Sequence, residues 1–233
     1  MYLFKTLKSL SKYSKQLTRS SQQLNAVPHQ TISNQSSTNM YEKFLDKNPS
    51  SICQTVDDAF IAKYANVVSE NIITLWKEVG FGMFCEGLFR IIEPNEYQAI
   101  IDDCYPMAGF GSATPFMTTV FGDIFAYVKD CRIGDYVVFV NVRYGTFRIL
   151  SDKVDILFNI VLFNKGCLSS WFSLDEYPII KSAKGIPALD ECYGYVPALA
   201  LGGKEAIDNI HILKTIPYIE MSLQSIGDLK RVQ

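Results

Sequence analysis

The chain has 233 residues, of which 48% are hydrophobic and 20% are charged, and its formal net charge is −2. This is the composition of a globular protein with one large domain or two small ones. No apolar run approaches the roughly 20 residues that span a bilayer, so we expect no transmembrane segment.

Charge is distributed unevenly along the chain. Five basic residues and no acidic one lie in residues 1–19, and the first acidic residue is Glu42. The rest of the chain is therefore acidic. An acidic body disfavours direct binding of nucleic acid, because neutralising phosphates requires clustered lysine and arginine. It favours a basic protein as the partner.

Residues 1–40 are predicted to be an extension that precedes the fold. Residues 1–19 combine a leucine stripe with a lysine stripe, which predicts a short basic amphipathic helix. Residues 20–39 are rich in Ser, Gln, Asn and Thr, which predicts a disordered tether. Three roles stay open: a targeting segment, a contact with anionic membrane or a partner, or a dispensable extension with Met40 as the functional start.

The folded part is expected to begin near Tyr41 with two helices and a strand. Thr55 and Asp57 are candidate N-caps of one helix that runs to Gly80, and a short strand covers residues 87–92. Pro94 opens a second helix, which ends before Pro106.

The middle of the chain is predicted to consist of antiparallel strands after a mobile surface loop over residues 107–115. Strands over 116–121 and 123–129 flank Gly122, and strands over 135–142 and 146–150 form a hairpin. The glycines of the loop do not follow the pattern of a phosphate loop, and a strand rather than a helix follows them.

The last third is predicted to hold a helix between Asp152 and Gly166, a broken helix near Pro178, and a buried apolar strand from Tyr195 to Leu201. Because Pro197 cannot donate to a strand ladder, that strand should be an edge strand or a bulge. A strand over 209–214 and a helix over 216–226 follow. Helices and antiparallel strands are segregated, so the fold class is α+β, with a mixed, mainly antiparallel sheet packed against helices.

The residues that catalysis or metal binding requires are scarce. The only histidines are His29 and His211, and the six cysteines include no pair at CxxC spacing. We expect no enzyme activity and no cofactor. The cysteines are interpreted as buried free thiols of a protein in a reducing compartment, the cytoplasm.

Asp123 is the least ordinary carboxylate, because it follows Gly122 within an aromatic strand pair. One interpretation is a turn residue that accepts hydrogen bonds from nearby backbone N–H groups. The other is a polar anchor at the edge of a groove that binds a partner. The acidic turn from Asp190 to Tyr195 is the other element that we expect to be functional, as a candidate contact with a partner.

Four motifs in the first folded part occur in a recognisable order: Leu75–Gly82, Glu86–Phe89, Glu93–Tyr97 and Phe121–Tyr127. Together they resemble the GAD-like domain, although Glu93 stands where that family usually has Asn and Tyr127 where Trp is frequent. Asp190–Gly203 and the segment Ile210–Gly227 are similar to the C-terminal domain of type VI secretion DNase-immunity proteins. The expected domains are therefore a GAD-like domain over 41–150 and an immunity C-terminal domain over 151–233, packed as one unit.

The resemblance implies an immunity protein that occludes a cognate toxin, expected to be a basic nuclease. The expected contact surface comprises the 107–115 loop and the residues Gly122, Asp123, Tyr127, Asp190, Glu191, Tyr193 and Tyr195. Three alternatives stay open: a non-catalytic regulatory protein-binding module of the same superfamily, an enzyme for a small ligand in a sheet-edge pocket, and a tRNA-linked module. The acidic body disfavours the last of these.

Overall fold

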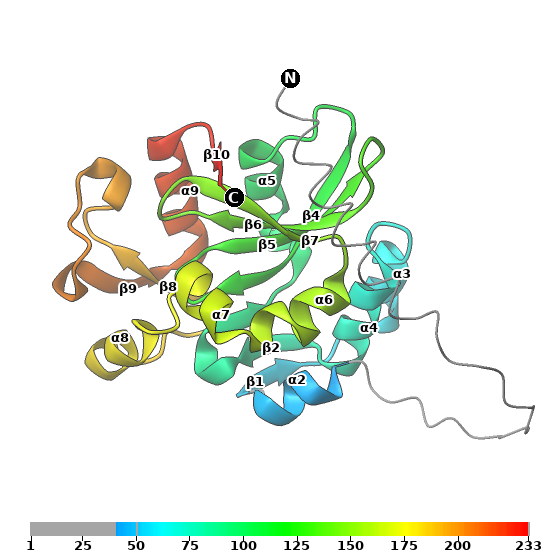
Figure 1. Ribbon diagram of the computed structural model, residues 1–233, viewed down its shortest axis with the longest axis horizontal. Coiled ribbons are helices and arrows are strands. Elements are labelled where there is room, and N and C mark those ends of the chain that lie inside the picture. The colour runs from blue at the N-terminus through cyan, green and yellow to red at the C-terminus, as the bar shows by residue number, and fades with distance from the viewer. Residues whose placement is uncertain (1–40, 50, 233) are drawn as a thin grey trace, which may run out of the picture. The chain divides into compact units, whose positions relative to one another are not determined.

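An eight-stranded sheet forms the centre of the computed structural model, which describes residues 41–49 and 51–232 (Figure 1). The predicted extension over residues 1–40 lies outside the described residues. Neighbouring strands are antiparallel except the last pair, in which β10 runs parallel to β7. In spatial order the strands are β1 (Ile52–Gln54), β2 (Phe81–Phe84), β3 (Phe89–Ile91), β4 (Gly111–Thr119), β5 (Ile124–Asp130), β6 (Tyr136–Asn141), β7 (Thr146–Ser151) and β10 (Lys230–Arg231).

A second, two-stranded antiparallel sheet joins β8 (Glu191–Tyr195) to β9 (Ile210–Lys214). Helices and mainly antiparallel strands together confirm the predicted α+β class. Among the described residues, no helix has the length and hydropathy needed to cross a membrane. The α-helices are α2 (Glu42–Lys47), α3 (Asp58–Tyr64), α4 (Glu70–Glu78), α5 (Pro94–Cys104), α6 (Val154–Asn159), α7 (Lys165–Phe172), α8 (Tyr177–Lys184) and α9 (Thr215–Ile226).

The large sheet is buried on both faces. Along β5, Phe125 and Tyr127 contribute to one hydrophobic cluster, while Ile124, Ala126 and Val128 contribute to the other. This alternation follows from the period of two in a strand. Helices α6 and α7 cover the first face, and α5 and α9 cover the second (Figure 1). The aromatic surplus of the sequence is therefore mostly core.

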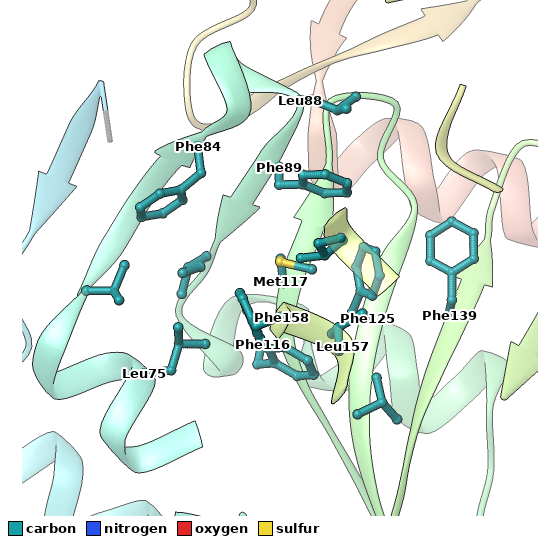
Figure 2. Packing of buried hydrophobic residues seen from close by; sticks show 14 of the residues in the cluster. Leu75, Phe84, Leu88, Phe89, Phe116, Met117, Phe125, Phe139, Leu157 and Phe158 are labelled. Atoms are coloured by element: carbon teal, nitrogen blue, oxygen red, sulfur yellow. The ribbon is translucent and has the colours of Figure 1, made fainter. Parts of the chain in front are cut away.

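Phe172 of α7 packs the C-terminal part of the chain against the central strands. Its ring centroid lies 5.5 Å from that of Phe89, 5.3 Å from Phe125 and 5.0 Å from Phe139. Figure 2 shows the three strand phenylalanines among the packed side chains of this face. Both expected domains thus contribute to one continuous cluster, and the boundary near residue 150 stays a prediction.

The helix expected between Asp57 and Gly80 is two helices. Asp57 caps α3 as predicted, because its Oδ1 accepts a 2.7 Å bond from the N–H of Phe60. The chain then leaves the helical path after Tyr64, whose carbonyl accepts from both Val67 and Val68. The two β-branched valines and the preceding Asn have low helix propensity, which explains the break.

Two helix signals in the C-terminal part are wrong. The residue before α6 is Lys153 rather than Asp152, and no side chain caps that helix. Gly166 lies inside α7 instead of ending a helix. Asn164 starts α7, since its side-chain oxygen accepts a 3.2 Å bond from the N–H of Cys167. The N-cap hydrogen bond of Asn164 stabilises the start of α7 by more than a single glycine in its first turn destabilises it.

Two strand boundaries also differ from the prediction. The expected loop 107–115 ends early, because β4 begins at Gly111 and already buries Ala113 and Thr114. The expected strand Tyr195–Leu201 is wrong, since β8 ends at Tyr195. Pro197 has no N–H to continue the ladder. The hairpin of β6 and β7, helix α5 and helix α9 are confirmed.

Candidate functional site

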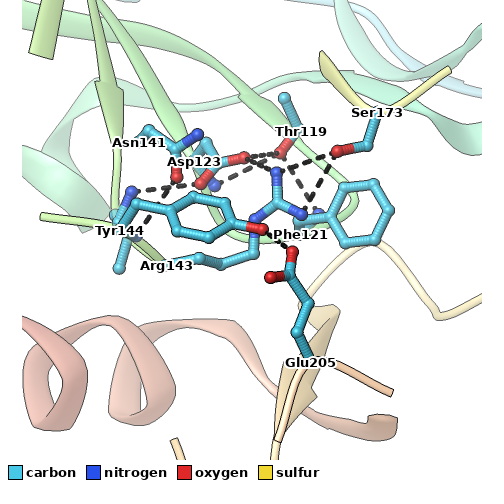
Figure 3. A network of polar contacts seen from close by, with 9 residues as sticks. Thr119, Phe121, Asp123, Asn141, Arg143, Tyr144, Ser173 and Glu205 are labelled. Atoms are coloured by element: carbon cyan, nitrogen blue, oxygen red, sulfur yellow. Dashed lines mark hydrogen bonds and ion pairs between the residues drawn. The ribbon is translucent and has the colours of Figure 1, made fainter. Parts of the chain in front are cut away.

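Asp123 lies in the turn immediately before β5, after Gly122, whose φ of +81° belongs to the left-handed region that favours glycine. The carboxylate is fully buried. Its Oδ1 accepts a 3.0 Å bond from the N–H of Val142, and its Oδ2 accepts 3.0 Å bonds from Thr119 Oγ1 and Arg143 Nη2 (Figure 3). The structure therefore shows the backbone-bonded turn residue of the first interpretation.

Arg143 is the buried counter-ion of Asp123. Its guanidinium lies 4.2 Å from the ring centroid of Phe121 and within 3.5 Å of Ser173 Oγ, just after α7. Burial acts to lower the pKa of Arg143, but the Asp123 carboxylate outweighs it, so the pKa is raised. The network joins the β4–β5 turn, the β6–β7 turn and the end of α7.

Tyr144 extends this network to the surface. Its side chain is half-exposed, and its hydroxyl donates to the Glu205 carboxylate, as Figure 3 shows. Burial and the bond to Glu205 raise the pKa of Tyr144. Glu205 belongs to the β8–β9 loop, which we define as residues 196–209. The ribbon of this loop is drawn in orange at the left of Figure 1.

Asp190 and Glu191 form an acidic turn at the start of β8. Lys214, on β9, lies 2.6 Å from Asp190 Oδ2 and 3.3 Å from Glu191 Oε1. The hydrogen bond from Lys214 lowers the pKa of Asp190. The two carboxylate side chains are 68% and 29% exposed, so both reach solvent.

The remaining candidates are buried. The Tyr127 hydroxyl donates to Asp135, and that of Tyr193 donates to the carbonyl of Gly185. The N–H of Tyr195 donates to the hydroxyl of Tyr218 at 3.2 Å. Of the seven predicted contact residues, only Asp190 and Glu191 therefore present charge to solvent.

The structure nevertheless brings most of these candidates together. The N–H of Tyr193 donates to the carbonyl of Val120 at 2.8 Å, so β8 lies against the β4–β5 turn that holds Gly122 and Asp123. The rings of Phe121 and Tyr193 pack with centroids 5.7 Å apart. Tyr127 is the exception, since it contacts the β5–β6 turn.

The sequence interpretation missed the exposed apolar side chains of the β8–β9 loop. Val196 is 47% exposed, Leu201 59% and Ile207 37%. The sequence signal for this loop was the glycine pair Gly202–Gly203. A Cβ on Gly203 would lie 1.9 Å from the Pro197 carbonyl oxygen, so the two ends of the segment 197–203 approach each other closely. These apolar residues therefore lie in a closed loop after β8 and not in a buried strand.

Within the described part of the chain, no group of three or more His, Cys, Asp or Glu side chains is arranged to hold a metal ion. The five described cysteines are free thiols, as predicted, but only Cys192 is buried, and Cys131 is exposed. Burial raises the pKa of Cys192 to about 12. A cavity of about 50 Å³ lies beside Trp171 and Arg148, much smaller than the roughly 300 Å³ of typical small-molecule sites.

Comparison with known proteins gives two family matches. Residues 39–140 match the GAD-like domain, and residues 151–225 match the C-terminal domain of T6SS immunity protein Tdi1. The crystal structure of Atu4351 from Agrobacterium tumefaciens has the same fold, with a TM-score of 0.60 and 16% identity over 80% of this chain and 89% of that chain. No curated protein matches the chain.

Proposed function

Because the chain carries a GAD-like domain followed by a T6SS immunity protein Tdi1 C-terminal domain, we propose that it is an immunity protein. It binds a cognate type VI secretion toxin and neutralises it by stoichiometric occlusion, without catalysis, in competition between bacteria. The match over residues 151–225 carries this proposal. The site of action is the cytoplasm, where a nuclease toxin meets DNA.

The charge of the folded part supports a nuclease as the toxin. All 24 acidic residues lie at Glu42 or later, whereas five of the 22 basic residues lie in residues 5–19. A nuclease holds DNA through a basic surface, because it must neutralise phosphates. An acidic inhibitor complements that surface, which accelerates association and excludes DNA.

We place the contact surface on the acidic turn and the β8–β9 loop. Between residues 190 and 214 the chain has four carboxylates and two lysines. The exposed Val196, Leu201 and Ile207 supply apolar contact area beside these charges. A few apolar anchors with a charged rim are typical of protein interfaces.

The buried candidates have a supporting role in this proposal. Asp123 and Gly122 shape the turn against which β8 packs, and Tyr193 and Tyr195 anchor β8 itself. These buried residues hold the acidic turn and the β8–β9 loop in place. In this proposal the partner contacts the turn and the loop, and does not contact the buried residues themselves.

Co-expression tests the function directly. The product of the adjacent open reading frame is expressed in a bacterial host with and without this chain, and growth is followed. We expect rescue, together with a complex of fixed stoichiometry by light scattering and calorimetry. Binding without rescue would favour the regulatory module instead. Absence of any complex, or turnover of a substrate by the purified chain alone, would overturn the proposal.

A further inference from the structure

Arg90 is a buried cation for which the described part of the chain supplies no carboxylate partner. It lies at the centre of β3, where Phe89 and Ile91 face the first hydrophobic cluster and Arg90 faces the opposite side. The residue is 1% exposed. Its Nη2 donates long bonds of 3.3 Å and 3.4 Å to the carbonyls of Pro187 and Ala188. Its Nε and Nη1 are buried and have no partner among the described residues.

The neighbouring ionisable groups do not compensate this charge. Those that act on Arg90 electrostatically are the Cys192 thiol and the phenols of Tyr177, Tyr97 and Tyr193. All four are neutral near pH 7, since burial raises their pKa values. Burial lowers the pKa of Arg90, yet a guanidinium stays protonated in proteins. A buried charge without a counter-ion is strongly unfavourable.

Thr118 supplies a second unpartnered donor beside Arg90. The two residues are register partners in the antiparallel ladder of β3 and β4, so their side chains lie next to each other on one face. The Thr118 hydroxyl is also buried and has no partner among the described residues. Arg90 Nε, Arg90 Nη1 and the Thr118 hydroxyl therefore lie on one face of the sheet as buried donors without a partner among the described residues, and a bound anion would satisfy them.

We propose that a small monovalent anion, chloride, binds between the Arg90 guanidinium and the Thr118 hydroxyl. The segment that contains Pro187 and Ala188 lies against the site, since the carbonyls of both residues accept from the guanidinium. The anion neutralises Arg90 and strengthens the packing of this segment, which ends at the acidic turn. The role is independent of the proposed toxin binding.

Thermal unfolding at constant ionic strength tests the site. Sodium gluconate is replaced stepwise by sodium chloride, and we expect the Tm of the unchanged protein to rise by about 2–4 °C, as ligand binding to the native state requires. Arg90→Met and Thr118→Val should lose that rise. The control Arg132→Met should keep it, because Arg132 is half-exposed and paired with Asp130.

A crystal grown in bromide provides a second measurement that does not depend on the variants. We expect an anomalous peak within hydrogen-bond distance of Arg90 Nη1 or Nε. A water without anomalous signal at that position would overturn the proposal. An equal chloride response in the unchanged protein and in Thr118→Val would overturn it as well, even if Arg90→Met does not fold.

Discussion

Arg143 donates to Asp123 across 20 residues of sequence, with Nη2 and Oδ2 3.0 Å apart and both side chains excluded from solvent. The pair joins the turn before β5 to the turn before β7. Ser173, in the part of the chain that follows, lies within 3.5 Å of the same guanidinium. The ion pair thus connects the β4–β5 turn, the β6–β7 turn and the end of α7. Strand β8, which follows the acidic turn, packs against the first of these segments.

Replacing Arg143 by Met should destabilise the fold by about 3–5 kcal/mol, because it leaves the Asp123 charge buried without its counter-ion. Urea unfolding followed by circular dichroism measures the loss. The double variant Asp123→Asn with Arg143→Met should lose less than the sum of the two single variants. The control Arg231→Met should cause a much smaller loss, because Arg231 is exposed on β10. Equal losses for Arg143→Met and Arg231→Met would contradict this prediction.

Gly194→Ala should destabilise the protein by about 1–3 kcal/mol through overpacking. A Cβ at this position would lie 2.6 Å from Cε2 of Tyr218 and 2.7 Å from Cδ1 of Leu213. The same unfolding experiment applies, and hydrogen exchange should show faster exchange of β8 and β9. Unchanged stability would mean that Tyr218 does not pack over β8 as described.

Charge reversal of the acidic turn should weaken toxin binding more than about tenfold, mainly through slower association. The variant is Asp190→Lys with Glu191→Lys, and surface plasmon resonance at two salt concentrations measures it. The matched control is Asp102→Lys with Asp103→Lys, since both residues are exposed on α5. Similar affinity for both double variants would place the contact elsewhere.

Cys131 should react with iodoacetamide in the native protein at pH 8, whereas Cys192 should not. Cys131 is exposed. Cys192 is buried, and burial raises its pKa to about 12, so it lacks both access and thiolate. Peptide mass mapping after timed alkylation, with a urea-unfolded sample as the control, compares the two. Labelling of Cys192 at the rate of Cys131 would contradict the placement of β8.

The Asp130 carboxyl should titrate at a pKa of about 2. Arg132 causes this, since its side chain donates to both carboxylate oxygens at 3.1 Å and 2.8 Å and its N–H donates at 2.8 Å. Because the folded pKa lies below the unfolded value of about 3.9, Asp130 stabilises the fold above pH 4 and loses that effect as pH falls through 2. Carbon-detected NMR titration measures the pKa, which Arg132→Met should raise.

Capping residues, prolines and turn residues in the sequence correctly predicted helices and a hairpin whose ends are set by neighbouring residues in the chain. Pro94 opened α5, Asp57 capped α3, and the turn at Arg143 closed the β6–β7 hairpin. The predicted strand over 195–201 failed because its apolar residues resemble a core strand, although Pro197 prevents continuation of the ladder. Periodicity indicates which side chains are apolar, but not whether another segment covers them.

The sequence by itself determined the fold class, the acidic body and the two domain matches, because composition and short motifs carry that information. Only the tertiary structure decided the burial of each candidate residue. It pairs Asp123 with Arg143, gives Arg90 no counter-ion among the residues that the structure describes, and exposes Asp190. The reason is physical: burial and charge pairing depend on contacts between residues far apart in the chain, which no local pattern encodes.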